Sequence, residues 1–371
     1  MSSSNLREQQ RAMNASQHFR PTYPAAREAF RTAAAARGLS VTSHRNPARG
    51  AAGEELATDV VLLGPAEASR LMIVVSGTHG AEGFCGSGIQ VAWLAGGNPL
   101  PADTAILFVH AINPYGFSHV RRVTEDNVDL NRNFVDHGNA KPANPGYDEL
   151  RDVICPREWT EASERKNLAA LQAYAAKHGL DALENAVASG QYVDPRGVFY
   201  GGTQPTWSNR TLRAILAPFA PTARQVAFID LHTGIGPYGF GEIMSNHGRN
   251  DPGDKIMKRW WGPEATYFDD GTSSSYYVAG DTNIGVTQAL PQARVAGITL
   301  EYGTIPKEDM MNAVRADNWL YVHGDLASPQ GRDIKARIRA AFYPDKDDWK
   351  DMVVERGCYV MKRMLRCLAE N

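Results

Sequence analysis

Residues 71–86 read LMIVVSGTHGAEGFCG, an apolar run followed at once by a glycine-rich turn. The run at 71–75 is nearly continuous and rich in β-branched residues, which is typical of a strand covered on both faces. The turn holds His79 and Glu82, three residues apart and surrounded by four glycines. Glycine permits a sharp backbone turn, so both side chains can point inward at the end of the strand.

Four further apolar runs have the same character. They are DVVLL (59–63), AILFVHAI (105–112), VAFIDL (226–231) and GITLE (297–301). Helical patterns separate or flank them, at 23–37, 87–95, 162–178, 208–217 and 347–370. Strands that alternate with helices predict an α/β fold with a mainly parallel sheet between two helical layers.

The chain of 371 residues shows no internal repeat, low-complexity linker or hinge, so we expect one domain over residues 1–371. The region 133–160 is the least regular and contains Pro142, Pro145 and Pro156. Long loops inside compact domains are often functional, and we expect this one to cap a pocket for a small substrate.

Composition excludes several classes of protein. The net charge of −2 gives no electrostatic footprint for nucleic acid or anionic membrane. No apolar run is long enough to cross a bilayer, and the N-terminus lacks the apolar core of a signal peptide. The four cysteines are far apart, which favours free thiols and a cytoplasmic protein. The sequence does not decide whether the chain forms a homo-oligomer.

Polar residues with metal-binding or proton-transfer chemistry follow the strand-like runs, where ligand sites of α/β sheets form. His79, Glu82 and His232 match the two histidines and one carboxylate that hold many catalytic zinc ions. Glu301, at the end of the last run, is the candidate general base for a metal-activated water. A lone H-x-x-E is common by chance, and a strand-end Glu is usually solvated. The conjunction of these residues indicates the metal site.

The segment NPYGFSHVRRVTEDNVDLNRNF (113–134) carries several cationic and amide side chains, namely Arg121, Arg122, Asn127, Asn131 and Arg132. Arginine offers a rigid fork that matches a carboxylate. We therefore expect a pocket for an anionic group of the substrate. For the isolated Arg-Arg pair, a solvated basic turn is the competing interpretation.

The order of these motifs resembles the zinc carboxypeptidase superfamily, which includes carboxypeptidases A and B and the aspartoacylase/succinylglutamate desuccinylase branch. The matching motifs are H-x-x-E, N-P-x-G, D-L-N-R-N-F, D-L-H-T-G and a strand-end Glu, and they span about residues 72–304. The whole chain is most similar to a largely uncharacterised bacterial branch. The resemblance implies a three-layer α/β/α fold with a mixed sheet of about eight strands.

The resemblance also implies roles for single residues. One zinc ion per chain would be bound by His79, Glu82 and His232, with Glu301 acting as base and then as acid. Asn131 and Arg132 would hold a substrate carboxylate. Either Arg121 or Arg122 would polarise the scissile carbonyl, and we favour Arg122. Asp230 either orients a metal ligand or caps nearby backbone.

One feature of the digestive enzymes, a mobile tyrosine before the catalytic Glu, has no secure counterpart here. Tyr276, Tyr277 and Tyr238 are the candidates, and the first two are our choice for substrate binding.

Together these features predict a zinc-dependent hydrolase that cleaves an amide bond in a small carboxylate-bearing substrate, either an N-acyl amino acid or a short peptide. The alternatives are a metallocarboxypeptidase acting on peptide C-termini, an esterase with the same machinery, and an inactive relative that binds a metal or an anion. A serine hydrolase is disfavoured because residues 85–89, CGSGI, do not form a G-x-S-x-G elbow.

Overall fold

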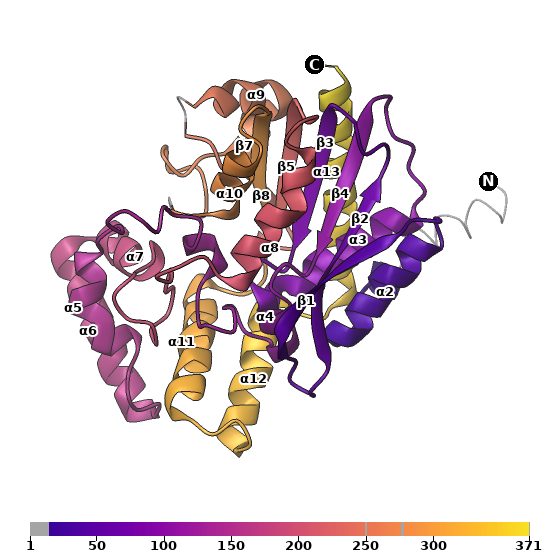
Figure 1. Cartoon of the computed structure of the whole chain (residues 1–371). Coiled ribbons are helices and arrows are strands. Elements are labelled where there is room, and N and C mark those ends of the chain that lie inside the picture. Colours follow the sequence, from indigo (N-terminus) through magenta and orange to yellow (C-terminus); the bar gives the residue numbers. More distant parts are fainter. Residues whose placement is uncertain (1–14, 249–250, 276–277, 371) are drawn as a thin grey trace, which may run out of the picture.

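The computed structural model describes residues 15–248, 251–275 and 278–370. Its centre is a sheet of eight strands (Figure 1). They are β1 (Val41–Arg49), β2 (Glu55–Leu63), β3 (Arg70–Ser76), β4 (Thr104–His110), β5 (Gln225–Tyr238), β6 (Gly241–Ser245), β7 (Ala265–Thr266) and β8 (Arg294–Gly303).

The strands lie in the order β1-β2-β4-β3-β5-β8-β6-β7. The four middle strands, β4, β3, β5 and β8, are mutually parallel. The next strand on either side, β2 or β6, pairs antiparallel with this group. The predicted mixed, mainly parallel sheet of about eight strands is therefore confirmed.

All five predicted apolar runs fall on strands, β2, β3, β4, β5 and β8. In β3, Met72 and Val74 belong to one hydrophobic core, while Leu71, Ile73 and Val75 belong to the other. This strand is therefore buried on both faces, which explains its continuous apolar pattern.

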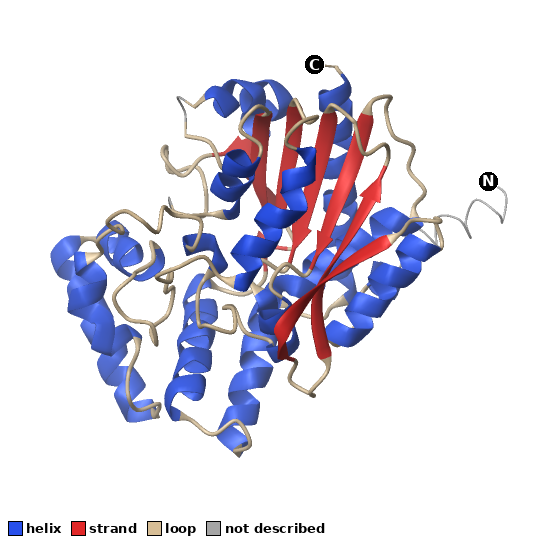
Figure 2. Ribbon diagram, in the orientation of Figure 1, coloured by secondary structure: helices blue, strands red, loops and turns tan. Residues whose placement is uncertain are grey.

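Helices cover both faces of the sheet (Figure 2). One face packs against α2 (Tyr23–Ala35), α3 (Gly83–Ala95) and α13 (Asp347–Ala369). The other packs against α8 (Trp207–Leu216) and α10 (Thr282–Ala289), and α9 (Pro252–Trp261) adjoins β8. The expected three layers are present, and the predicted C-terminal helix is α13.

A further group of helices lies beyond the carboxyl ends of the parallel strands, in the lower half of Figure 1. They are α4 (Pro114–His119), α5 (Pro145–Ile154), α6 (Glu161–His178), α7 (Leu180–Ala188), α11 (Lys307–His323) and α12 (Pro329–Phe342). Short 3₁₀ turns complete the described elements: η1 (Ala15–His18), η2 (Gly80–Glu82), η3 (Leu130–Arg132), η4 (Ala217–Phe219) and η5 (Gly262–Glu264).

Part of the region expected to be irregular, 133–160, is helical. Asn144 caps α5 by accepting a hydrogen bond from the Tyr147 backbone N–H, and Pro145 occupies the first turn. Tyr147, Leu150 and Ile154 then bury one face of the helix. The apolar residues of 145–154 are therefore spaced three to four positions apart, which is the pattern of an amphipathic helix.

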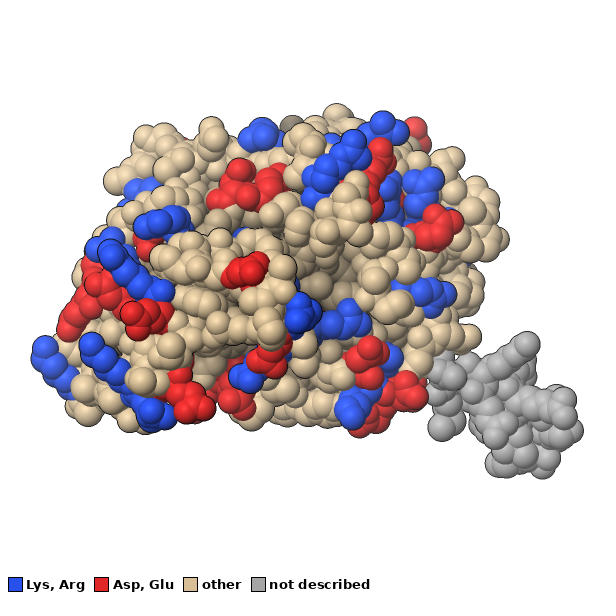
Figure 3. Space-filling model, turned by 90° about the horizontal axis from the view of Figure 1, so that it is seen from below, with Lys and Arg blue, Asp and Glu red and all other residues tan. Residues whose placement is uncertain are grey.

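Charges of both signs are interspersed on the face shown in Figure 3. This agrees with the small net charge of the sequence. No helix in the described part of the chain combines the length and apolar character needed to cross a membrane.

The turn between β3 and α3 packs directly on backbone. A Cβ added to Gly80 would lie 1.9 Å from the carbonyl carbon of Gly116 in α4, so only glycine fits there. The pairing of these two segments continues in hydrogen bonds from the Gly80 and Ala81 N–H groups to the carbonyls of Arg122 and Arg121. The turn that carries His79 and Glu82 is therefore held against α4 and the segment after it.

We expect Gly80→Ala to destabilise the protein by about 1–3 kcal/mol or more, because backbone on both sides must move. Gly138→Ala is the matched control, since its added Cβ would come no closer than 3.2 Å to the exposed Asp136 carboxylate. Urea unfolding followed by circular dichroism measures both. Equal midpoints for the two variants would contradict the close packing of the turn.

Candidate metal centre

Three potential metal ligands reach one point from two neighbouring strands. β3 and β5 are parallel partners, with Ser76 opposite Leu231. His232 therefore lies in β5 beside the turn that follows β3. In that turn His79 has an extended backbone, and Glu82 ends η2.

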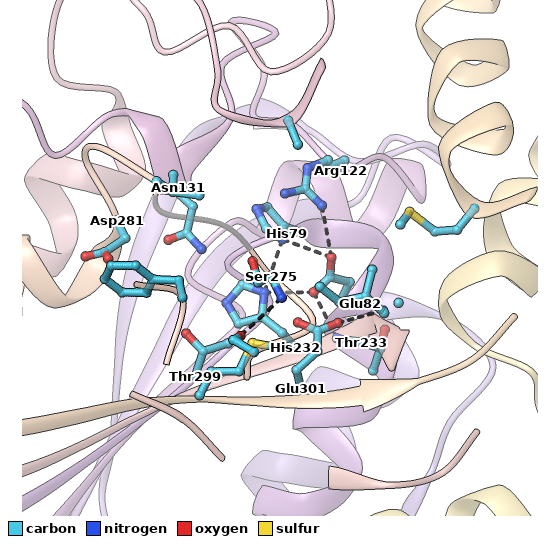
Figure 4. A pocket seen from close by; sticks show the side chains of 18 of the residues that line it. His79, Glu82, Arg122, Asn131, His232, Thr233, Ser275, Asp281, Thr299 and Glu301 are labelled. Carbon is cyan, nitrogen blue, oxygen red and sulfur yellow. Dashed lines mark hydrogen bonds and ion pairs between the residues drawn. The ribbon is translucent and has the colours of Figure 1, made fainter. Parts of the chain in front are cut away.

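The ligand atoms of these three residues converge (Figure 4). The His79 Nδ1 atom lies 2.9 Å from Glu82 Oε1, and the His232 Nδ1 atom lies 2.9 Å from Glu82 Oε2. The two Nδ1 atoms are 3.1 Å apart. Ligand atoms around a tetrahedral zinc ion, at bonds of about 2.0–2.1 Å, are about 3.3 Å apart. The three side chains thus form a group that could hold one metal ion.

Two buried aspartates contact the opposite side of each imidazole. The His79 Nε2 atom lies 3.1 Å from Asp129 Oδ1, and the His232 Nε2 atom lies 2.9 Å from Asp230 Oδ2. Carboxylates at these positions favour a proton on Nε2 and leave the Nδ1 lone pairs facing Glu82. When both imidazoles are neutral with the proton on Nε2, two Nδ1 lone pairs and a carboxylate face one another, and this donor set fits a metal ion.

Asp230 is anchored by two hydroxyl groups as well. Thr78 Oγ1 donates to Asp230 Oδ1 at 2.7 Å, and Thr282 Oγ1 donates to Asp230 Oδ2 at 2.5 Å. Asp230 therefore contacts the imidazole of His232, as expected of a residue that orients a metal ligand.

The charges of the centre reinforce one another. Burial alone would raise the pKa of Glu82, but His79 and His232 outweigh it and hold that pKa well below its usual range. Burial likewise opposes a charge on His232, yet Asp230 and Glu82 raise its pKa well above the ordinary value. Glu82 is therefore ionised at neutral pH, as a metal ligand must be.

Glu301 lies beside this group, on β8 directly opposite His232. One of its oxygens, Oε1, accepts a hydrogen bond from the Ile235 N–H at 3.1 Å. Burial first, and then repulsion from Glu82, raise the pKa of Glu301 to about 8. A carboxyl group with a pKa near neutrality can both accept and return a proton.

The two adjacent arginines have different surroundings. Arg122 lines the pocket, its Nε donates to Asp129 Oδ2 at 2.9 Å, and its Nη1 lies 3.4 Å from Glu82 Oε1. Arg121 is not among the residues found to line this pocket, and its Nε donates to Asp317 Oδ2 at 3.1 Å. Its guanidinium also stacks on Tyr321, 3.6 Å from the ring centre. Only Arg122 of the pair therefore faces the metal centre.

Asn131 and Arg132 both line the same pocket. Asn131 Oδ1 accepts a hydrogen bond from the Thr282 N–H at 3.1 Å. Arg132 is buried, with Nη1 3.3 Å from Asp129 Oδ2 and Nη2 donating to the Ala188 carbonyl. Its Nε has no hydrogen-bond partner among the described residues.

Asp129 is a site residue that sequence reasoning did not assign. It contacts His79, Arg122 and Arg132 at once, and the two arginines outweigh burial to hold its pKa well below the usual range. Asp129 is the first residue of D-L-N-R and lies close to both arginines in the sequence, and this position could have indicated its role.

No tyrosine candidate is found at the site among the described residues. Tyr276 and Tyr277 lie outside the described residues. Tyr238 is exposed, and its hydroxyl pairs with Asp348 at 3.3 Å. It is not among the residues that line the pocket.

The pocket has a volume of about 140 Å³. The metal-binding group and Glu301 line it, and a second part of its wall is apolar. The apolar side chains are Ala188, Phe199, Ile235, Met244, Phe268, Val278, Met310, Met311 and Phe342. None of the lining residues comes from 133–160, so the expected cap is wrong, and the wall near Arg132 is built by Ala188 and Phe199 instead.

Fold and site thus define an α/β protein with a candidate metal centre at the carboxyl ends of its parallel strands. Residues 19–356 match the family described as "Protein of unknown function (DUF2817)", and the chain belongs to that family. No curated protein matches the chain.

Several solved structures are similar to the chain. Carboxypeptidase A from Helicoverpa armigera is 13% identical, with 87% of this chain and 74% of that chain covered and a TM-score of 0.44. Succinylglutamate desuccinylase from Chromobacterium violaceum is 15% identical, with 88% and 75% covered and a TM-score of 0.36. Murein-tripeptide amidase from Escherichia coli O157 is 16% identical, with 77% and 91% covered and a TM-score of 0.33.

We expect His79→Ala to lose most bound metal, because it removes one of the three protein ligands. His178→Ala, an exposed histidine on α6, is the control and should retain the metal of the unaltered protein. Elemental analysis after purification gives the metal content. Undiminished metal in His79→Ala would remove this residue from the ligand set.

Proposed function

We propose that the protein is a zinc-dependent hydrolase that cleaves an amide bond in a small carboxylate-bearing substrate, an N-acyl amino acid or a short peptide. The observation that carries the proposal is the convergence of the His79, Glu82 and His232 ligand atoms beside the buried Glu301. These residues would hold one zinc ion per chain. When bound, zinc polarises a water molecule and a carbonyl group, so that attack occurs near neutral pH.

The protein groups supply proton transfer and charge stabilisation. Glu301 accepts the proton of the attacking water and returns it to the nitrogen of the leaving amine. The pKa of about 8 favours the protonated carboxyl in the absence of a cation, and a nearby cation lowers it toward the ionised base. Arg122, which faces the same pocket, donates to the oxyanion that develops on the carbonyl.

Arg132 and Asn131 are the candidates for holding the substrate carboxylate. Arg132 lines the pocket, and its buried Nε has no partner among the described residues; such a donor is costly unless a ligand satisfies it. A volume of about 140 Å³ is well below the roughly 300–1,000 Å³ of pockets for drug-sized ligands. The group enclosed beside the metal is therefore the size of one amino acid.

We expect Glu301→Gln to keep bound metal and to lose at least about a hundredfold in kcat, the lower end of general acid–base contributions. The assay is a panel of N-acyl amino acids, dipeptides and their ester analogues, with the zinc-loaded protein. Glu355→Gln, an exposed carboxylate on α13, is the control. Turnover by Glu301→Gln equal to that of the control would exclude Glu301 from the mechanism. The preferred members of the panel separate deacylase, carboxypeptidase and esterase activity, and an inactive metal-binding relative would hydrolyse none.

Arg132→Gln should raise KM about 10- to 100-fold for substrates with a free carboxylate, because a charge-assisted hydrogen bond contributes about 1.5–3 kcal/mol. The same substrates with an amidated carboxylate should change little. Comparing the two forms within one variant cancels any disturbance of Asp129 and the metal centre. A KM increase of the same size for both forms would argue against a carboxylate clamp.

A further inference from the structure

A second, larger cavity adjoins the pocket of the metal centre. Its volume is about 1010 Å³. Asn246, Phe268 and Asp281 line both spaces. From there the larger cavity continues between α9 and α10, whose residues line it. Both helices contact β8. We call this space the α9–α10 groove.

β8 runs from the metal centre to the far end of the groove. Glu301 and Thr299 line the pocket, and Val295 lines the groove. These positions are separated by even numbers of residues, so they share a face of the strand. Gly297 lies between them, and the buried side chain of Asn283 from α10 packs over it. Arg294 and Glu301 are seven positions apart, which corresponds to about 23 Å along the strand, and Arg294 has the opposite parity.

Three cations gather at the far end of the groove. Lys255 and Arg259 are four residues apart on α9, so they lie on the same side of the helix. Arg294 begins β8, and it lines another small cavity together with Arg259, so these two arginines are neighbours. Among the described residues, none of these three side chains makes a hydrogen bond or an ion pair.

The carboxylates of the groove are already engaged. Asp251 Oδ2 accepts a hydrogen bond from the Gly248 N–H at 3.0 Å, and Asp281 Oδ1 accepts one from the Ile284 N–H at 3.0 Å. The far end of the groove therefore offers cationic donors without a protein anion bound to them. Such a cluster favours a carboxylate or phosphate group.

We propose that the α9–α10 groove is an extension of the substrate site, which takes an arm of about 20 Å on the released amino acid and binds its anionic end through Lys255, Arg259 and Arg294. The proposal rests on the hydrolase function proposed above. It narrows the substrate class to acylated amino acids or peptides whose released part carries a long arm ending in a carboxylate or a phosphate.

A binding measurement tests the cationic end without requiring catalysis. Inorganic pyrophosphate is titrated by calorimetry into the full chain after metal removal, so that the anion cannot bind to the metal. Arg259→Ala/Arg294→Ala should weaken binding by about tenfold or more, the effect of losing charge-assisted hydrogen bonds. Lys258→Ala is the matched control, because Lys258 is on the same helix, pairs with Asp254 and does not line the groove. Equal affinity in the double variant and the control would overturn the anion site.

A kinetic measurement tests whether the groove serves the substrate. N-acetyl amino acids are compared with arms of about 20 Å that end in a carboxylate, a phosphate or a neutral amide. The unaltered protein and Lys258→Ala should prefer one of the anionic arms by about tenfold in kcat/KM, and the double variant should lose that preference. The preferred anion distinguishes carboxylate from phosphate. A neutral arm that reacts equally well, or a preference that survives in the double variant, would overturn the proposal. Hydrolysis of no substrate at all would instead refute the hydrolase function, while the pyrophosphate titration still decides the anion site.

Discussion

The site depends on one carboxylate shared between two imidazoles. Glu82 contacts the Nδ1 atoms of both His79 and His232, and all three side chains are buried. In an interior of low dielectric constant, two nitrogen atoms and a negative charge this close together require a positive charge among them, which is either a proton on an imidazole or a metal ion. Asp129 and Asp230 hold the other nitrogen of each ring, so the rings cannot easily turn away. The sheet thus brings three residues that could hold a metal ion together, beyond the end of β3 and beside β5.

Asp129 connects the metal centre with the substrate-binding side of the pocket. The same buried carboxylate contacts a metal ligand, His79, and two arginines, Arg122 and Arg132. The orientation of the ligand and the positions of the two cations therefore share one anchor. A group bound by the arginines would be positioned relative to the metal by this link, with little freedom between them. The short D-L-N-R segment supplies both the anchor, Asp129, and one of the arginines, Arg132, because Asp129 caps the 3₁₀ turn η3 in which Arg132 lies.

The pocket and the α9–α10 groove use the same strand for different purposes. The carboxyl end of β8 places Glu301 beside His232, whereas its first residue, Arg294, is at the far end of the groove. Side chains alternate along a strand, so Thr299 and Glu301 face the pocket together. Ile298 and Leu300, of the opposite parity, are buried in the hydrophobic core.

The sequence by itself determined the central strands, the order of the motifs and the group His79, Glu82, His232 and Glu301. These features are local, because a strand buried on both faces must be apolar and its end must carry the polar chemistry. It did not predict β1, which is mostly polar, or β6 and β7, which have only five and two residues. Nor did it settle the choice between Arg121 and Arg122, although Arg122 was favoured, because the two residues are adjacent and share the same sequence surroundings. The left-handed backbone of Val120, at the end of α4, precedes the pair, and the packing of that turn aims Arg122 at Glu82 and Arg121 at Asp317. Only tertiary structure decides such a direction, because it depends on partners that lie 40 and 196 residues away in the chain.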